Sequence, residues 1–121
     1  MSKSLKVLVV EDEPLVRIDI ADYLDDAGFE VIEAATAKEA IIAMEQHGDI
    51  RLIFTDVDMP GDMDGLMLAA AVADRWPPIR IIVTSGHRVV EITDIPDGSV
   101  FFSKPYRGNE VVASIQEMLH T

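Results

Sequence analysis

The sequence predicts an α/β protein: a doubly wound, five-stranded parallel sheet of (βα)5 type, in one domain covering residues 1–121. Five short runs rich in apolar and β-branched residues alternate with segments of helical period. The runs are apolar on both faces, as in parallel strands that helices cover on each side. With 121 residues, 49% of them hydrophobic, the chain can supply one substantial core.

The predicted strands are short, and turn residues or helix starts follow them. They cover residues 5–10, 30–35, 51–55, 80–84 and 99–102. Right-handed crossovers between parallel strands bring all the carboxyl ends to one edge of the sheet. In such sheets a ligand site lies beyond these ends, near the point where the strand order reverses. We therefore expect each functional residue to come just after a strand.

The first predicted helix begins at Pro14 and ends at Gly28, which are common residues at these two positions. Its apolar stripe consists of Val16, Ile20, Leu24 and Ala27. The opposite face carries Asp19, Asp22, Asp25 and Asp26. This division predicts a helix with one buried face and one solvated, acidic face.

The remaining helices have less uniform signals. The second starts with a capping-box spacing, Thr36 to Glu39, and ends by Gly48. The third covers about residues 64–75 and stops before a Pro-Pro pair. The last carries apolar residues at helical offsets over 111–119.

The fourth helical candidate, residues 88–95, is the weakest. It contains Val89, Val90, Ile92, Thr93 and Ile95. Side chains of this kind are indifferent helix formers, because they are β-branched and lose χ1 freedom in a helix. We expect this helix to be short or mobile.

The chain is strongly acidic, with 22 acidic and 10 basic residues and a net charge of −12. This charge repels phosphate backbones and anionic lipid headgroups, so we expect neither direct nucleic-acid binding nor membrane association. No apolar run approaches the roughly 18 residues of a membrane span. The chain has no cysteine and no signal-peptide pattern at its start. These features favour a cytoplasmic location.

Acids, a hydroxyl and an ammonium come together at the predicted strand ends. In chain order they are Glu11 and Asp12, Asp56 and Asp58, Thr84, and Lys104. Two carboxylates about 4–6 Å apart repel by roughly 3–4 kcal/mol at an effective dielectric of about 20, so a fold keeps them only with compensation. Oxygen ligands and a shared phosphate favour Mg²⁺ over Ca²⁺ or zinc. Alternatively, acids 11–13 only provide negative charge at a helix amino terminus.

Four segments, in this order and spacing, carry a resemblance to a known family. They are V-V-E-D-E-P, L-I-F-T-D-V-D-M-P-G-D-M-D-G, I-I-V-T-S-G-H and V-F-F-S-K-P-Y. Across nearly the whole chain they resemble the receiver domain of two-component response regulators, of the stand-alone type. The resemblance implies the flavodoxin-like receiver fold. It also implies a regulatory switch with only its own phosphotransfer and slow dephosphorylation activity, not an enzyme.

The resemblance assigns a role to each of these positions. Asp56 would accept a phosphoryl group from a phosphohistidine, Thr84 and Lys104 would contact the phosphoryl oxygens, and Thr84 with Phe101 would form the switch. The Mg²⁺ ligands would come from Glu11, Asp12, Asp56 and the backbone carbonyl of Asp58. The implied partners are a sensor histidine kinase or histidine phosphotransfer protein and an unknown downstream protein target. A homodimer is a further alternative.

The alternative function is an enzyme. The segment from Asp56 to Asp58 is similar to the nucleophile and general-acid pair of haloacid-dehalogenase-type phosphatases. That family begins with this motif and has threonine or valine where Pro60 stands here. A calcium-binding EF-hand loop would require glutamate at the position of Met67. An unphosphorylated docking scaffold is a third alternative, which the intact set of acids, threonine and lysine disfavours.

The sequence departs from the family pattern in two places. Gly61 and Asp62 make the loop after Asp56 one residue longer, which predicts a locally altered start of the third helix. The segment between Thr84 and Phe101 is slightly short, and our hypothesis is that its helix orders on phosphorylation or partner binding. The apolar run over 66–73 is either a contact surface or an ordinary alanine-rich helix.

Overall fold

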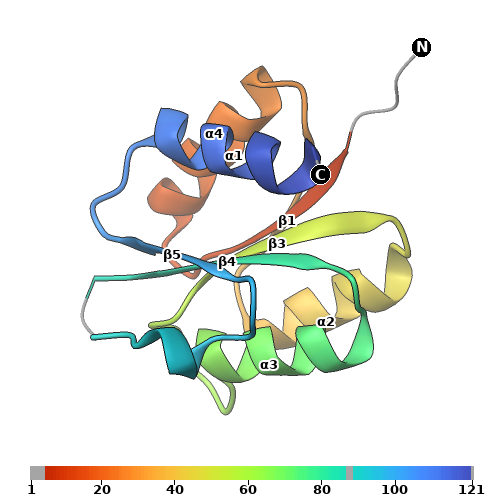
Figure 1. Ribbon diagram of the computed structural model, residues 1–121, viewed down its shortest axis with the longest axis vertical. Helices are drawn as coiled ribbons and strands as arrows, with labels where there is room; N and C mark the ends of the chain where they lie inside the picture. Colours follow the sequence, from red (N-terminus) through yellow and green to blue (C-terminus); the bar gives the residue numbers. More distant parts are fainter. Residues whose placement is uncertain (1–4, 87–88, 121) are drawn as a thin grey trace.

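The computed structural model describes residues 5–86 and 89–120, and it confirms the predicted α/β class (Figure 1). In this part of the chain, one parallel sheet has the strand order β2-β1-β3-β4-β5. The strands are β1 (Lys6–Val10), β2 (Glu30–Ala34), β3 (Ile50–Asp56), β4 (Arg80–Ser85) and β5 (Val100–Ser103). The α-helices are α1 (Pro14–Asp26), α2 (Ala37–Gln46), α3 (Gly65–Arg75) and α4 (Gly108–His120). The predicted strands match these within a residue or two.

The helices form two layers, with α1 and α4 on one face of the sheet and α2 and α3 on the other (Figure 1). Alternate residues of β1 serve both cores, because successive side chains of a strand point to opposite faces. Val7 and Val9 pack with α1 and α4, whereas Leu8 and Val10 pack with α2 and α3. All four are fully buried. This two-sided burial explains why the run reads as apolar throughout.

Side chains of the preceding loops set the starts of α2 and α3. Thr36 Oγ1 accepts a hydrogen bond from the Glu39 N–H (3.1 Å), and the Glu39 carboxylate accepts one from the Ala35 N–H (3.0 Å). Thr36 is therefore confirmed as the N-cap, but the Glu39 carboxylate binds the N–H of the residue before the cap and not that of Thr36, as a full capping box would require. Asp64 caps α3 by accepting a hydrogen bond from the Met67 N–H (2.9 Å). Despite the extra residue in the preceding loop, α3 begins at Gly65, next to its predicted start.

One helical prediction is wrong, and the expectation of a short fourth helix is confirmed. Ala27, predicted on the buried stripe, is exposed just beyond the end of α1. In place of a helix over 88–95, the described residues form only the 3-10 turn η1 (Ile92–Asp94), and Arg88 lies outside the described residues. Besides the β-branched side chains, Pro96 disfavours the helical conformation at Ile95, whose backbone is extended. Ordering of this segment on phosphorylation stays a hypothesis.

The strand order reverses between β1 and β3, so the carboxyl ends of these two strands border the crevice where ligands bind in such sheets. Backbone hydrogen bonds extend the ladder past the strand ends. The Val57 N–H donates to the Thr84 carbonyl (2.8 Å), and the Lys104 N–H donates to the Ser85 carbonyl (3.0 Å). Residues just after β3 and β5 are therefore held almost as firmly as the strands themselves.

Gly65, the first residue of α3, packs directly against the backbone of Asp56 at the end of β3. Its N–H donates to the Val57 carbonyl (3.1 Å), which closes the loop between β3 and α3. A Cβ atom at this position would overlap the backbone carbonyl of Asp56. Only glycine allows α3 to start this close to the end of β3.

We predict that Gly65→Ala destabilises the protein by about 2–4 kcal/mol, because the overlap forces the backbone at Asp56 to move. Gly48→Ala is the matched control, since Gly48 is exposed and a Cβ there would meet no atom within 4 Å. Urea denaturation of both variants measures the two changes in the free energy of unfolding. Equal values would contradict the role assigned to Gly65.

Candidate functional site

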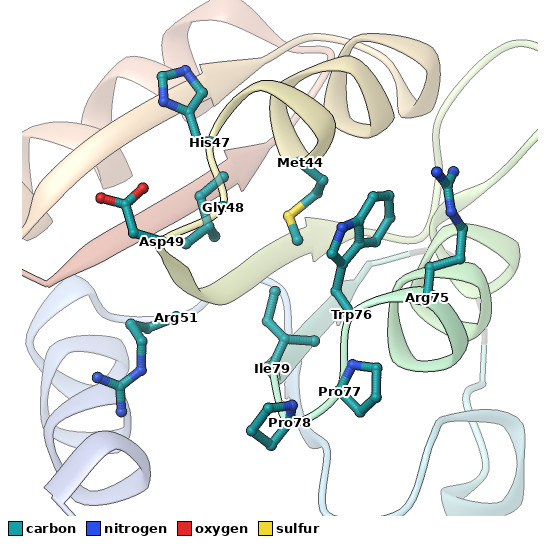
Figure 2. A pocket seen from close by; sticks show the side chains of 11 residues that line it. Met44, His47, Gly48, Asp49, Arg51, Arg75, Trp76, Pro77, Pro78 and Ile79 are labelled. Atoms are coloured by element: carbon teal, nitrogen blue, oxygen red, sulfur yellow. The ribbon is translucent and has the colours of Figure 1, made fainter.

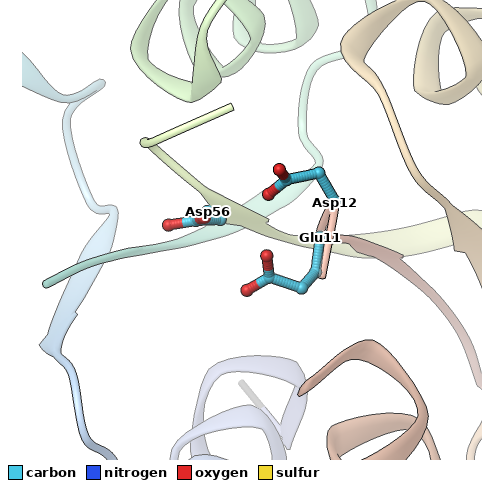
Figure 3. Close-up of side chains that lie close together, drawn as sticks. All are labelled: Glu11, Asp12 and Asp56. Carbon is cyan, nitrogen blue, oxygen red and sulfur yellow. The ribbon is translucent and has the colours of Figure 1, made fainter. Parts of the chain in front are cut away.

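Three acidic side chains gather at the carboxyl edge of the sheet. Glu11 and Asp12 follow β1, and Asp56 is the last residue of β3 (Figure 3). One carboxylate oxygen of each lies within 4.8 Å of the others. Glu11 and Asp56 are each only 2% exposed. The fold therefore holds two buried carboxylates beside a third, that of Asp12, which is only partly buried. This grouping is costly unless a positive charge lies nearby.

Lys104 provides part of this positive charge at the same edge of the sheet. Its Nζ lies 2.9 Å from Glu11 Oε1 and 3.2 Å from Asp56 Oδ2. Lys104 directly follows β5, as the sequence predicts, and its backbone is fixed by the hydrogen bond to Ser85. One ammonium faces three carboxylates, so the cluster still has an excess of negative charge.

The pKa values of the cluster reflect this imbalance. Burial, together with the neighbouring Glu11 charge, raises the pKa of Asp56 to about 6, although Lys104 opposes the shift. Burial and the contact with Glu11 also raise the pKa of Asp12. For Lys104, burial alone would lower the pKa, but the hydrogen bond to Glu11 and the two carboxylate charges outweigh it and raise the pKa. The ionised form of Asp56 is therefore destabilised near neutral pH.

Two buried polar atoms at this edge have no hydrogen-bond partner within the described residues: Asp56 Oδ1 and Thr84 Oγ1. The two residues pair across β3 and β4, so their side chains project from the same face of the sheet. A buried acceptor and hydroxyl without partners are rare and call for a ligand. The acidic cluster and Asp56 Oδ1 fit a hard divalent cation such as Mg²⁺, and Thr84 Oγ1 can donate to an anion bound beside it.

Asp58 stands apart from the three clustered carboxylates. Its Oδ2 accepts a hydrogen bond of 2.8 Å from the hydroxyl of Ser85, at the end of β4. The sequence places Asp58 at the metal through its backbone carbonyl, and that prediction stays untested. The tether through Ser85 was not predicted, because Ser85 reads as part of an ordinary turn in the sequence.

The predicted switch residue Phe101 lies in β5 opposite Val83 of β4. Its ring is half-buried and packs on the core beneath α2 and α3. Thr84 pairs instead with Phe102, so Thr84 and Phe101 project from opposite faces of the sheet. Movement of the Thr84 hydroxyl would therefore have to reach Phe101 through the backbone at the end of β4.

Two further side chains support the site without having been predicted to do so. Arg17 of α1 donates from Nη1 to the backbone carbonyl of Glu11 (2.9 Å) and from Nε to Glu33 (3.2 Å). Tyr106 packs edge-on against Phe54, with ring centroids 5.5 Å apart, and burial raises the pKa of its hydroxyl to about 12. The sequence around Arg17 did not indicate that its side chain would contact Glu11.

A separate pocket of about 290 Å³ lies at the opposite edge of the sheet, where α2 and α3 end (Figure 2). Two of the basic residues that line it, Arg75 and His47, have structural roles. Arg75 pairs with Glu45 (2.9 Å) and lies 4.2 Å from the centroid of the Trp76 ring. His47 is the C-cap residue of α2, and its backbone N–H donates to the Ala43 carbonyl (2.9 Å). This pocket is therefore remote from the acidic cluster and unconnected with it.

A comparison of the sequence with known protein families agrees with the site geometry at the carboxyl edge of the sheet. The family profile described as the response regulator receiver domain matches residues 7–116, which is nearly the whole chain. This chain belongs to the response regulator receiver domain family. Receiver domains are regulatory switches, not conventional enzymes, so the haloacid-dehalogenase-type phosphatase reading finds no support in the family match. Among the described residues, no helix is long and apolar enough to cross a membrane.

Curated relatives of this receiver domain are longer proteins. The sensor kinase CckA of Brucella abortus is 33% identical over 98% of this chain, and the chain spans 13% of that protein. The transcriptional regulatory protein PdtaR of Mycobacterium tuberculosis is 32% identical over 92% of this chain, which spans 55% of PdtaR. The receiver domain thus matches parts of proteins with different overall architectures.

Solved structures match the receiver domain at nearly full length. A response regulator receiver protein from Sinorhizobium medicae superposes with a TM-score of 0.89 at 25% identity, covering 98% of this chain and 97% of the other. The receiver domain of the hybrid histidine kinase CckA gives a TM-score of 0.79 at 34% identity, covering 94% and 98%.

We predict that Asp56→Asn stabilises the magnesium-free protein by about 1–3 kcal/mol at about pH 8. Folding raises the pKa of Asp56 from 3.8 to about 6, so the ionised carboxylate lowers stability above that pH. The advantage of the variant should shrink as the pH falls through 6 towards 4, where the native carboxyl is protonated.

The charge-matched control is Asp62→Asn, because Asp62 is exposed in the loop after β3. Urea denaturation in the presence of a chelator, repeated across this pH range, measures both variants. If the two substitutions change the free energy of unfolding equally at every pH, Asp56 does not carry the strain assigned to it.

Proposed function

We propose that this receiver domain accepts a phosphoryl group on Asp56 from a phosphohistidine of a partner protein, and that the modification switches a protein-interaction face. The observation that carries the proposal is the buried Asp56 carboxylate, which lies between Lys104 and two further acids and whose Oδ1 lacks a partner within the described residues. Membership of the receiver family supports the same assignment.

The side chains around Asp56 have separate roles in this proposal. Glu11, Asp12 and Asp56, with the backbone carbonyl of Asp58, would hold Mg²⁺ directly or through water. When bound, Mg²⁺ neutralises charge on the transferring phosphoryl oxygens. Lys104 already lies 3.2 Å from Asp56 Oδ2 and would pair with a phosphoryl oxygen once Asp56 carries an acyl phosphate. The unpartnered Thr84 hydroxyl would donate to another.

In the transfer, a carboxylate oxygen of Asp56 attacks phosphorus, and the P–N bond of the phosphohistidine breaks. The imidazole keeps the electron pair of that bond and takes up a proton. A carboxylate is a weak nucleophile towards an anionic phosphoryl group, and the Lys104 ammonium reduces the repulsion between them.

The phosphodonor protein would dock beside the site, on an open hollow of about 660 Å³ that Lys104 borders. Leu15 and Val16 of α1 form one side of this hollow, and Pro105 and Tyr106 form the other. Leu15 is 83% exposed, so its side chain is available for contact with a partner. A helix that carries the phosphohistidine could cover Leu15 and present its phosphoryl group to Asp56.

We predict that incubation with Mg²⁺ and acetyl phosphate adds one phosphoryl group to the native protein and none to Asp56→Asn. Intact-mass spectrometry measures the product. Equal labelling of the two proteins would place the acceptor elsewhere. Rapid release of phosphate from general phosphate esters would favour a phosphatase instead.

We predict that Leu15→Ser slows phosphotransfer from a phosphorylated histidine phosphotransfer protein by about tenfold, because loss of one buried apolar contact costs about 1.5 kcal/mol. Labelling by acetyl phosphate, which needs no docking surface, should be unchanged. Ile42→Ser is the control, because Ile42 is an exposed apolar residue of α2 on the other layer. Equal slowing with both donors would show that Leu15 acts on the site itself, not on docking.

A further inference from the structure

The sheet face beside α3 is incompletely covered where the chain connects β4 to β5. The described part of this connection contains only η1 (Ile92–Asp94), which lies beside α3 in the lower layer of Figure 1. Ile95 is buried in the core, but Val89 and Ile92 are 87% and 82% exposed. A full helix here would bury such side chains against α3, so the face has apolar groups that its own chain leaves in water.

A groove runs between α3 and η1 at this place. We define this α3–η1 groove by a hollow of about 480 Å³, with Ala70 and Ala73 of α3 on one wall and Thr93 and Ile95 on the other. A second hollow of about 370 Å³ continues it towards the amino end of β4, and the two share Ala73 and Pro96. The small alanines keep the wall of α3 low, so the groove is open to a partner.

The rim of the α3–η1 groove is acidic. The acids on or next to it are Asp74, Glu91, Asp94 and Asp97, and all four are exposed. Among the described residues that line the two hollows, Arg80 is the one base. An apolar floor inside an acidic rim attracts a positively charged segment and repels an acidic one.

We propose that the α3–η1 groove docks a short basic segment of a partner protein, with apolar side chains of that segment on Ala70, Ala73 and Ile95. A second copy of this chain fits poorly, because each copy has a net charge of −12 and would present the same acidic rim. The inference goes beyond phosphotransfer to Asp56 and does not depend on it. It is tested without a phosphodonor.

The test is an NMR titration of the isotope-labelled protein with a synthetic peptide of about fifteen residues, made of leucine and lysine in an amphipathic order. We expect the amide signals of Ala70, Ala73, Thr93 and Ile95 to move. The same peptide with glutamate in place of lysine should leave them unchanged. Movement with the glutamate peptide, or the same movement on concentrating the protein alone, would overturn the proposal, the latter in favour of self-association.

Two double variants with the same net charge separate specific docking from general attraction. Asp74→Lys with Asp97→Lys reverses charge at the groove and should weaken binding of the lysine peptide by about tenfold. Asp22→Lys with Asp26→Lys reverses exposed charges of α1, on the other layer, and should change it less than about twofold. If both variants weaken binding equally, or if the signals that move belong to α1, the groove is not the docking site.

Discussion

The arrangement of this protein depends on the repulsion among three carboxylates held at one edge of a parallel sheet. Glu11, Asp12 and Asp56 lie together because β1 and β3 are neighbours whose carboxyl ends point the same way. Lys104 compensates only part of their charge. The remainder appears as the raised pKa of Asp56 and as a buried oxygen without a partner. Binding of a cation would relieve this unfavourable state. A phosphoryl group adds further negative charge, so the proposed transfer needs that cation and Lys104 beside it.

The scaffold tolerates the repulsion among the carboxylates because buried strands and backbone hydrogen bonds hold their positions. Strand β1 is buried on both faces, and backbone hydrogen bonds continue the sheet past the ends of β3 and β5. Gly65 brings the start of α3 against Asp56, so the loop between them has no freedom to move the carboxylate away. In contrast, the β4–β5 connection has no α-helix in its described part. The connection without an α-helix thus begins directly after Thr84 and Ser85, where β4 ends.

The sequence predicts most of the fold and the positions of the site residues, because both follow from local patterns. Buried parallel strands must be apolar on both faces, and acids directly after them must converge. What the sequence does not reveal depends on contacts between distant residues. The hydrogen bond from Ser85 to Asp58 and the contact of Arg17 with Glu11 exist only once β3, β4 and α1 have packed. The helical candidate over 88–95 is reduced to a short 3-10 turn in its described part, as its weak propensity predicts, and Pro96 adds to this effect.

The contact between Glu11 and Lys104 joins residues 93 positions apart along the chain. During synthesis the amino-terminal strands emerge from the ribosome long before Lys104 does, and domains of this size fold as units once their last elements are available. Until then Glu11 and Asp56 have no ammonium between them, and β5 cannot complete the sheet. If Asp56 is the phosphoryl acceptor, as proposed, the growing polypeptide would become competent to react only after the receiver domain has been synthesised as far as Lys104.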